Sequence, residues 1–209
     1  MKSLKTILII VAIGVVAWNS VYFRNLDEVK ASRTAKEFDA VEYASSFWSS
    51  KFPTAVDKAV DLTALTTLIS NNASKAFDDH SHALGIGNLR YFLVKGNGIV
   101  KSVQDDNVII VLDESKQQIV LATEFIFGNA VRDASGLINI NEFTNTMDFN
   151  NVSAEINKII RETVLPDFKK NVKAGEAVSF VGAIELNREH PELTDIEVIP
   201  VQLTIIKRE

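Results

Sequence analysis

The fold is decided by residues 91–127, which read YFLVKGNGIVKSVQDDNVIIVLDESKQQIVLATEFIF. Short runs rich in valine, isoleucine and phenylalanine alternate with polar or glycine-bearing breaks, as in neighbouring β-strands joined by tight turns. The glycines of the first break, Gly96 and Gly98, predict a turn, or else a bend within one long first strand. The segment therefore predicts a three-stranded meander. Its first strand contains the runs Tyr91 to Val94 and Ile99 to Val103, and the other two strands are Val108 to Leu112 and Ile119 to Phe127.

The chain beyond this meander returns to a helix and then to strands. Apolar residues recur at helical spacing from Val152 to Phe168, and Pro166 is expected to end the helix. Alternation predicts two further strands, at Val178 to Leu186 and at Ile199 to Ile205, with Pro200 at an edge or a bulge. Three strands, a helix and two strands is the order of an OB-type five-stranded barrel. The alternative is an open α+β sheet with the helices packed on one face.

Two helices are predicted before the meander. Apolar residues form a stripe from Leu26 to Phe52, Pro53 interrupts it, and a second stripe runs from Val56 to Phe77. Asp61 is expected to act as a helix N-cap within this region. The overall prediction is an α+β chain with a helical hairpin in residues 25–88 and an OB-like barrel domain in residues 89–209.

Residues 1–24 carry the pattern of an export signal. Lys2 and Lys5 precede an uncharged apolar run from Ile7 to Trp18, which extends to Phe23. This pattern is typical of a signal peptide or a short membrane anchor, and cleavage and retention both stay open. Because positive charge remains on the cytoplasmic side, the rest of the chain is expected in the periplasm, anchored to or exported across the bacterial inner membrane. The alternative is a buried N-terminal helix of a cytosolic protein.

Composition narrows the class further. A chain of 209 residues with 46% hydrophobic content suits one domain or two small ones with a real core. It has no cysteine, which excludes disulfides, thiolate metal sites and cysteine nucleophiles. The formal charge is −5, and removing Lys2 and Lys5 with the leader makes it −7. A nucleic acid is therefore not an expected partner.

Four segments resemble a bacterial family of predicted periplasmic lipoproteins, and the likeness covers the whole chain: Phe127 to Ile138, Asn150 to Ser153, Phe180 to Ala183 and Ile199 to Val201. The resemblance implies an association of the family with the genes of sugar ABC-transporter components. It thereby implies an accessory role in sugar uptake, with such components as partners. This sequence departs from the family in lacking the cysteine to which a lipid would be attached, so an uncleaved helix would have to replace the lipid anchor.

The polar connection between meander and helix, residues 128–150, is the candidate ligand- or partner-binding site. Amides, a guanidinium and carboxylates offer planar donors and acceptors, and loops on a rigid scaffold commonly carry such sites. The alternative is that these side chains cap turns and the following helix, with Asn150 or Asn151 as its N-cap. The candidate residues are Asn129, Arg132, Asp133, Ser135, Asn145, Asp148 and Asn150, together with Arg188, close to His190 in the loop between the last two strands.

Neither of two weak metal motifs leads us to predict a metal or cofactor. Asp133 to Glu142 partly match a calcium-binding EF loop, but Val131 stands where its first oxygen ligand is required. His80 and His82 follow two aspartates, yet two histidines without a distant third ligand are better explained as a solvated helix end.

Nucleophile and phosphate-loop signatures are missing from the sequence, which contains no G-x-S-x-G elbow and no glycine-rich phosphate loop. We therefore expect a non-enzymatic binding or accessory protein. The alternatives are a hydrolase that uses Asp133 or Asp148 with His190, and a purely structural envelope protein.

Overall fold

The computed structural model describes residues 38–85 and 87–206, so the predicted leader lies outside the described residues. From Asp39 onward these residues belong to one compact unit. Its helices are α3 (Ala40–Ser46), η1 (Phe47–Lys51), α4 (Phe52–Val56), α5 (Leu62–His80), α6 (Ala130–Ala134), η2 (Ile140–Glu142), α7 (Thr146–Ile159), η3 (Ile160–Val164) and α8 (Leu165–Asn171). Its strands are β1 (Val60–Asp61), β2 (Leu89–Val103), β3 (Asn107–Leu112), β4 (Gln118–Ala122), β5 (Ala177–Asn187) and β6 (Ile196–Ile206).

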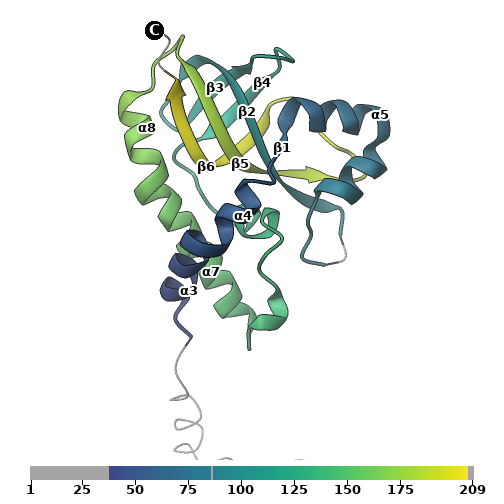
Figure 1. The fold of residues 1–209 in the computed structure, drawn as a ribbon, viewed down its shortest axis with the longest axis vertical. Coiled ribbons are helices and arrows are strands. Elements are labelled where there is room, and N and C mark those ends of the chain that lie inside the picture. Colours follow the sequence, from purple (N-terminus) through teal and green to yellow (C-terminus); the bar gives the residue numbers. More distant parts are fainter. Residues whose placement is uncertain (1–37, 86, 207–209) are drawn as a thin grey trace, which may run out of the picture. The chain divides into compact units, whose positions relative to one another are not determined.

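Five of the strands close into a barrel (Figure 1). The order around it is β2, β3, β4, β6 and β5, and β5 returns to pair with β2. All neighbours are antiparallel except β4 and β6, which pair in parallel. The short β1 adds to β2 in parallel outside the closed ring. The predicted OB-type order is confirmed, with a helix between the third and fourth barrel strands.

Strand β2 runs unbroken from Leu89 to Val103, so the turn expected at Gly96 to Gly98 is wrong and the single long strand is right. The glycines serve close packing. A Cβ on Gly98 would lie 2.5 Å from Ile110 Cγ2 and 2.5 Å from the backbone oxygen of Val111. Such approach requires glycine within a strand, and it lets β2 curve around the barrel to pair with both β3 and β5.

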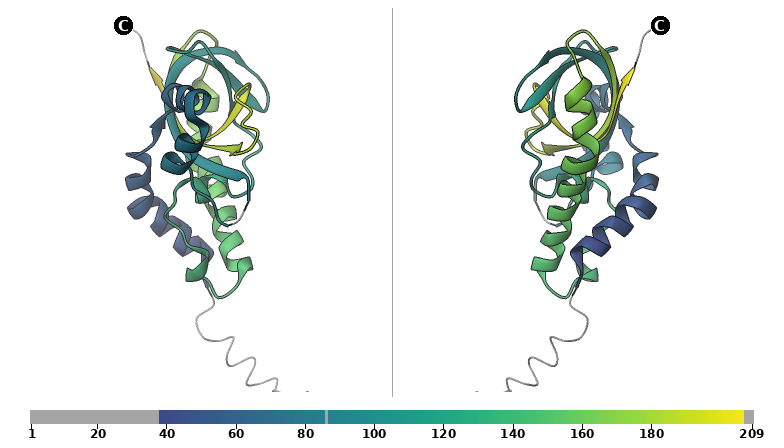
Figure 2. Two further views of the ribbon diagram at one scale, coloured as in Figure 1. Left: turned by 90° about the vertical axis from the view of Figure 1, so that its right-hand side faces the viewer. Right: turned by 90° about the vertical axis from the view of Figure 1, so that its left-hand side faces the viewer.

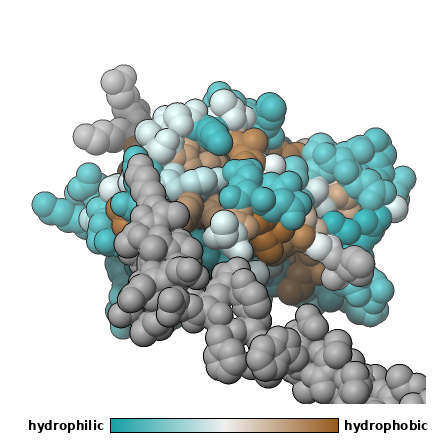
Figure 3. All heavy atoms as spheres, turned by 90° about the horizontal axis from the view of Figure 1, so that it is seen from below, coloured by the Kyte–Doolittle hydropathy of each residue, from teal (hydrophilic) through white to brown (hydrophobic). Residues whose placement is uncertain are grey.

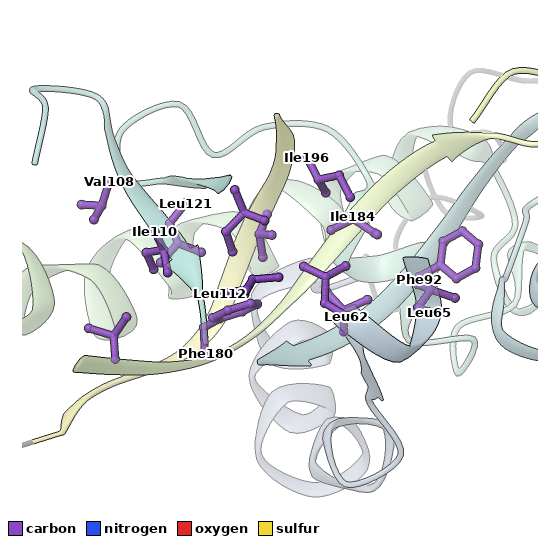
Figure 4. Packing of buried hydrophobic residues seen from close by; sticks show 14 of the residues in the cluster. Leu62, Leu65, Phe92, Val108, Ile110, Leu112, Leu121, Phe180, Ile184 and Ile196 are labelled. Carbon is purple, nitrogen blue, oxygen red and sulfur yellow. The ribbon is translucent and has the colours of Figure 1, made fainter. Parts of the chain in front are cut away.

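The hydrophobic core fills the barrel and continues under α5 (Figure 4). Phe92 and Phe180 are buried from β2 and β5, and Phe92 meets Phe77 of α5 edge to face at 5.2 Å between ring centroids. The start of α5 is fixed as expected, because the Asp61 carboxylate accepts a hydrogen bond from the Ala64 backbone N–H at 2.9 Å. This cap turns the chain from β1 directly onto the barrel.

Both prolines expected to interrupt helices lie inside continuous ones. In each case a π-helical turn, η1 or η3, ends one residue before an X-Pro pair, Phe52-Pro53 or Leu165-Pro166. Phe52 N–H donates to Phe47, and Leu165 N–H donates to Ile160, each five residues back. A wider turn accommodates the proline ring and its missing N–H, so the helix bends rather than ends.

The two helical regions before the barrel have different packing partners. The helix begun by α3 lies along α7, whereas α5 packs on β1 and β2 (Figures 1 and 2). The described parts of the two predicted helices thus pack on different elements, and residues 39–85 and 87–206 belong to one compact unit. None of the helices in the described ranges is long and apolar enough to cross a membrane.

Candidate functional site

The predicted polar connection joins β4 to α7 and contains α6 and η2. At its centre lies a buried ion pair between adjacent residues, Arg132 and Asp133, whose side chains are 2% and 3% exposed. Arg132 Nε donates to Asp133 Oδ1 at 2.7 Å, and Nη2 donates to Oδ2 at 3.2 Å. A charge this deep requires a partner of good geometry, and the two-pronged contact provides one.

Further contacts complete the environment of this pair. Arg132 Nη1 donates to the Phe149 carbonyl at 3.2 Å, and the guanidinium carbon lies 3.5 Å from the centre of the Phe149 ring. The Asn129 amide donates to Asp133 and, at 3.2 Å, to the Tyr91 hydroxyl. Ser135 Oγ donates to the Arg132 carbonyl at 2.6 Å. These residues therefore join the connection to α7 and to the barrel strand β2.

Tyr91 is the barrel's contribution to this network. Burial raises the pKa of the Tyr91 phenol, the Asn129 hydrogen bond opposes that shift, and nearby Glu185 adds to it. The hydroxyl thus stays protonated and neutral beside the Arg132–Asp133 pair.

Asn145 and Asp148 form the start of α7. The side-chain oxygen Oδ1 of Asn145 accepts from the Asp148 backbone N–H at 2.9 Å, and the Asn145 side-chain amide donates to the Asp148 carboxylate at 2.7 Å. The helix therefore begins at Thr146, and the expected N-cap at Asn150 or Asn151 is wrong because Asn145 occupies that position five residues earlier. The alternative role that the sequence allowed, helix capping, is the one that Asn145 has.

Arg188 lies in a separate part of the structure. Its Nη2 donates to Asp78 Oδ1 at 2.7 Å, tying the β5–β6 loop to the end of α5. His190 follows in that loop, where its backbone N–H donates to the Asn187 side chain at 3.3 Å. Among the described residues, the carboxylates of Asp133 and Asp148 and the ring of His190 share no hydrogen-bond network, which leaves the hydrolase alternative without an assembled acid–base pair.

The residues of the two partial metal motifs have other partners, although His82 and Asp133 line one pocket. Asp133 is engaged by Arg132, whereas Glu142 accepts from the Asn139 backbone N–H at 3.3 Å and from the Tyr43 hydroxyl at 3.1 Å. His82 pairs through its backbone with Tyr91, and burial lowers the pKa of its ring. Across residues 38–85 and 87–206, no group of three or more potential metal ligands occurs.

Sequence reasoning missed two exposed phenylalanines. Strand β4 ends at Ala122, so the strand expected to continue to Phe127 is too long. Phe125 and Phe127 lie in the loop that follows, 61% and 66% exposed, with their rings stacked at 6.2 Å. Figure 3 shows one face of the molecule, on which hydrophobic residues reach the surface among hydrophilic ones. The missed signal is that burial alternates along Phe125-Ile126-Phe127, where only the central residue points into the interior.

This loop is held firmly by α7 and η3. Ile126, which lies between the two phenylalanines in the sequence, is fully buried. Asn157 Nδ2 donates to the Gly128 carbonyl at 2.8 Å, and Arg161 Nη1 donates to the Ile126 carbonyl at 2.6 Å. The two phenylalanines are thus presented outward on an ordered backbone. We call Phe125 and Phe127 the aromatic pair.

A pocket of about 290 Å³ opens beside the aromatic pair. Two predicted site residues, Asn129 and Asn150, contribute to it. The complete lining is Ile126, Phe127, Gly128, Asn129, Asn150, Ser153, Ala154, Asn157 and Arg161. We call this the Phe127 pocket. The predicted connection therefore has two parts: the buried hydrogen-bond network around Arg132 and Asp133, and the exposed surface at the Phe127 pocket next to α7.

Comparison with solved structures finds the same fold. A crystal structure of an OB-fold protein from Thermotoga maritima is similar, with 27% sequence identity and a TM-score of 0.73. The similarity covers 82% of this chain and 100% of that chain. No match was found among the curated proteins.

Family comparison supplies the compartment. The family described as "Predicted periplasmic lipoprotein (DUF2291)" matches residues 11–204, beginning inside the apolar run of the predicted leader. Its description agrees with the periplasmic location and membrane attachment expected from that leader, although the 209 residues contain no cysteine to carry a lipid. Since the match spans most of its length, the chain belongs to this family of predicted periplasmic lipoproteins.

Proposed function

We propose that this protein is a non-enzymatic accessory module of the bacterial envelope, which docks on a partner protein through the aromatic pair and the Phe127 pocket. The observation that carries the proposal is the outward presentation of two phenylalanines on a loop that α7 and η3 hold by hydrogen bonds. Buried Ile126 anchors their loop, and Asn157 and Arg161 hold its carbonyl groups.

Exposure of these rings has a cost that a partner would remove. Full burial of a phenylalanine side chain is worth about 1.5–3 kcal/mol, so leaving Phe125 and Phe127 61% and 66% exposed forgoes about 2–4 kcal/mol together. Aromatic residues next to a pocket, held by an ordered backbone, are typical of the energetic centre of protein interfaces.

The charged groups of the connection support a binding role over catalysis. Arg132 and Asp133 neutralise each other in the interior, and Asp148 is engaged in the cap of α7. A catalytic acid or base needs access to the proton that it moves, and both carboxylates are instead occupied by structural partners.

For the partner, we propose a component of a sugar ABC-type uptake system. The association with sugar ABC-transporter genes that the family resemblance implies supports this choice. The periplasmic location is compatible with it. A membrane-attached accessory protein would meet a transporter subunit in the same membrane.

The test is crosslinking and affinity purification of the full-length chain from its own bacterial membranes. The variant replaces both rings, Phe125→Ser with Phe127→Ser, and the control replaces Val103, which is 45% exposed on β2, by serine. We expect the crosslinked partner to disappear with the first variant and to remain with the control. Recovery of the same partner in the same amount from both variants would exclude docking through the aromatic pair.

A further inference from the structure

We infer that the Phe127 pocket receives one aromatic side chain of the partner protein, and that a carboxylate next to this side chain pairs with Arg161. The inference rests on the proposed function and deepens it, because it states what the partner must present at the interface. It follows from the size, the walls and the charge of the pocket.

The pocket is small and has room for a single large side chain. Its volume of about 290 Å³ lies at the lower end of the range of about 300–1,000 Å³ usual for pockets that enclose drug-sized ligands. It opens beside the aromatic pair, so a partner surface that covers these rings would place one of its own side chains over the opening.

The walls of the pocket favour an aromatic ring. Phe127 and Ala154 supply apolar surface, and the amides of Asn150 and Asn157 lie beside them. Phe127 already stacks on Phe125 with 29° between the ring planes. A third ring in the pocket would extend this arrangement at the offset and tilted geometries that aromatic side chains prefer.

The charge at the pocket has one sign. Of the residues that line it in the described part of the chain, only Arg161 is charged, and Arg161 is exposed. One of its N–H groups donates to the Ile126 carbonyl at 2.6 Å. The guanidinium has five N–H donors, so it retains donors for a carboxylate at the rim.

A protein segment meets these requirements better than a free metabolite. Its aromatic side chain would enter the pocket while the flanking backbone crosses the aromatic pair, burying apolar surface outside the opening as well as inside. A small molecule confined to the pocket would leave Phe125 and the outer face of Phe127 in water. The occupant of the Phe127 pocket is therefore a segment of the partner protein that has an aromatic residue. The carboxylate next to this residue comes from a neighbouring Asp or Glu or from a chain terminus.

The probe is N-acetyl-L-phenylalanine, which has both the ring and the carboxylate, titrated into full-length protein in detergent micelles and followed by saturation-transfer NMR. The comparison probes are its amide, which lacks the carboxylate, and N-acetyl-L-alanine, which lacks the ring. Ala154→Leu fills the pocket from an exposed helix position, and Ala174→Leu is a matched change at an exposed site outside the lining.

We expect the acid to bind with a dissociation constant on the order of 1 mM, as is usual for a probe of this size. The amide should bind several-fold more weakly at low salt, the alanine derivative should not bind, and Ala154→Leu should weaken binding at least about tenfold while Ala174→Leu leaves it unchanged. Equal binding of acid and amide, or no effect of Ala154→Leu, would overturn the inference. Partner crosslinking that depends on the aromatic pair, without probe binding, would overturn this inference alone and leave the proposed function standing.

Discussion

Replacement of Arg132 by methionine should strongly destabilise the protein. The change keeps an unbranched apolar chain but removes both contacts to Asp133, at 2.7 and 3.2 Å, the 3.2 Å bond to the Phe149 carbonyl, and the cation–π contact with the Phe149 ring. It leaves the Asp133 carboxylate 3% exposed, with the Asn129 amide as its remaining side-chain donor among the described residues.

Breaking a buried ion pair from one side costs about 3–5 kcal/mol, because the other charge stays buried without compensation. For a chain of this length each kcal/mol lowers Tm by about 2–4 °C, so we expect Arg132→Met to lower it by about 6–20 °C. Urea unfolding followed by circular dichroism gives the free energy of unfolding directly.

A double variant separates the charge from the shape. Replacing both partners, Arg132→Met with Asp133→Leu, removes the uncompensated carboxylate, and pairs replaced by apolar residues of similar volume are often neutral or stabilising. We therefore expect the double variant to recover much of the stability lost by Arg132→Met alone. A loss below about 1 kcal/mol for the single variant would refute the view that this pair holds the connection in place.

Three other perturbations test separate parts of the structure. Burial, followed by the hydrogen bond to and the charge of Glu142, raises the pKa of Tyr43 from 10.0 to about 12, so the folded state holds this proton more tightly than the unfolded state. The resulting stability is present below pH 10 and is lost as the pH rises through 10 towards 12. The free energy of unfolding in urea should therefore fall over this pH range in the unchanged protein and fall less in Tyr43→Phe. An equal fall in both proteins would contradict the assignment to Tyr43. Gly98→Ala should destabilise by about 1–3 kcal/mol, because its Cβ would overlap the backbone of Val111, and an unchanged Tm would show that β2 and β3 do not pack this closely. Ser153→Ala should be neutral or stabilising by up to about 1 kcal/mol, because the Ser153 hydroxyl is buried without a partner among the described residues, and a loss above 1 kcal/mol would reveal a bond that the structure lacks.

The barrel could be predicted from sequence because its signals are local. Alternation within short apolar runs identified the strands, and their order around one helix identified the OB-type arrangement. The positions of Pro53 and Pro166 misled because a proline normally ends a helix, whereas here a π turn before each one absorbs it. Nothing in the residue types of η1 or η3 announces that wider turn.

The candidate site could be located but not interpreted from sequence. The polar connection was found by composition, yet asparagine, arginine and aspartate serve equally for ligand contact and for internal hydrogen bonding. Arg132 and Asp133 are neighbours in sequence, and only the short helix α6 and the position of Phe149 show that both side chains are buried together. The ligand- or partner-binding role of Asn129 and Asn150 stays a prediction, now attached to the Phe127 pocket.

The exposure of the aromatic pair could not be predicted from the sequence, because an apolar run usually continues a strand. Phe125 and Phe127 follow the apolar run after only Thr123 and Glu124, so the strand was expected to continue to Phe127. The strand ends at Ala122 because the chain leaves the barrel there, and Ile126 alone returns to the interior.

We propose that the aromatic pair is the surface through which this protein contacts its partner at the membrane. The most direct measurement is photo-crosslinking in living cells, with a photoreactive phenylalanine analogue at Phe127 in one full-length protein and at Val103 in another. We expect one discrete crosslinked product from position 127 and none from position 103. Crosslinking from position 103 with none from position 127 would contradict it.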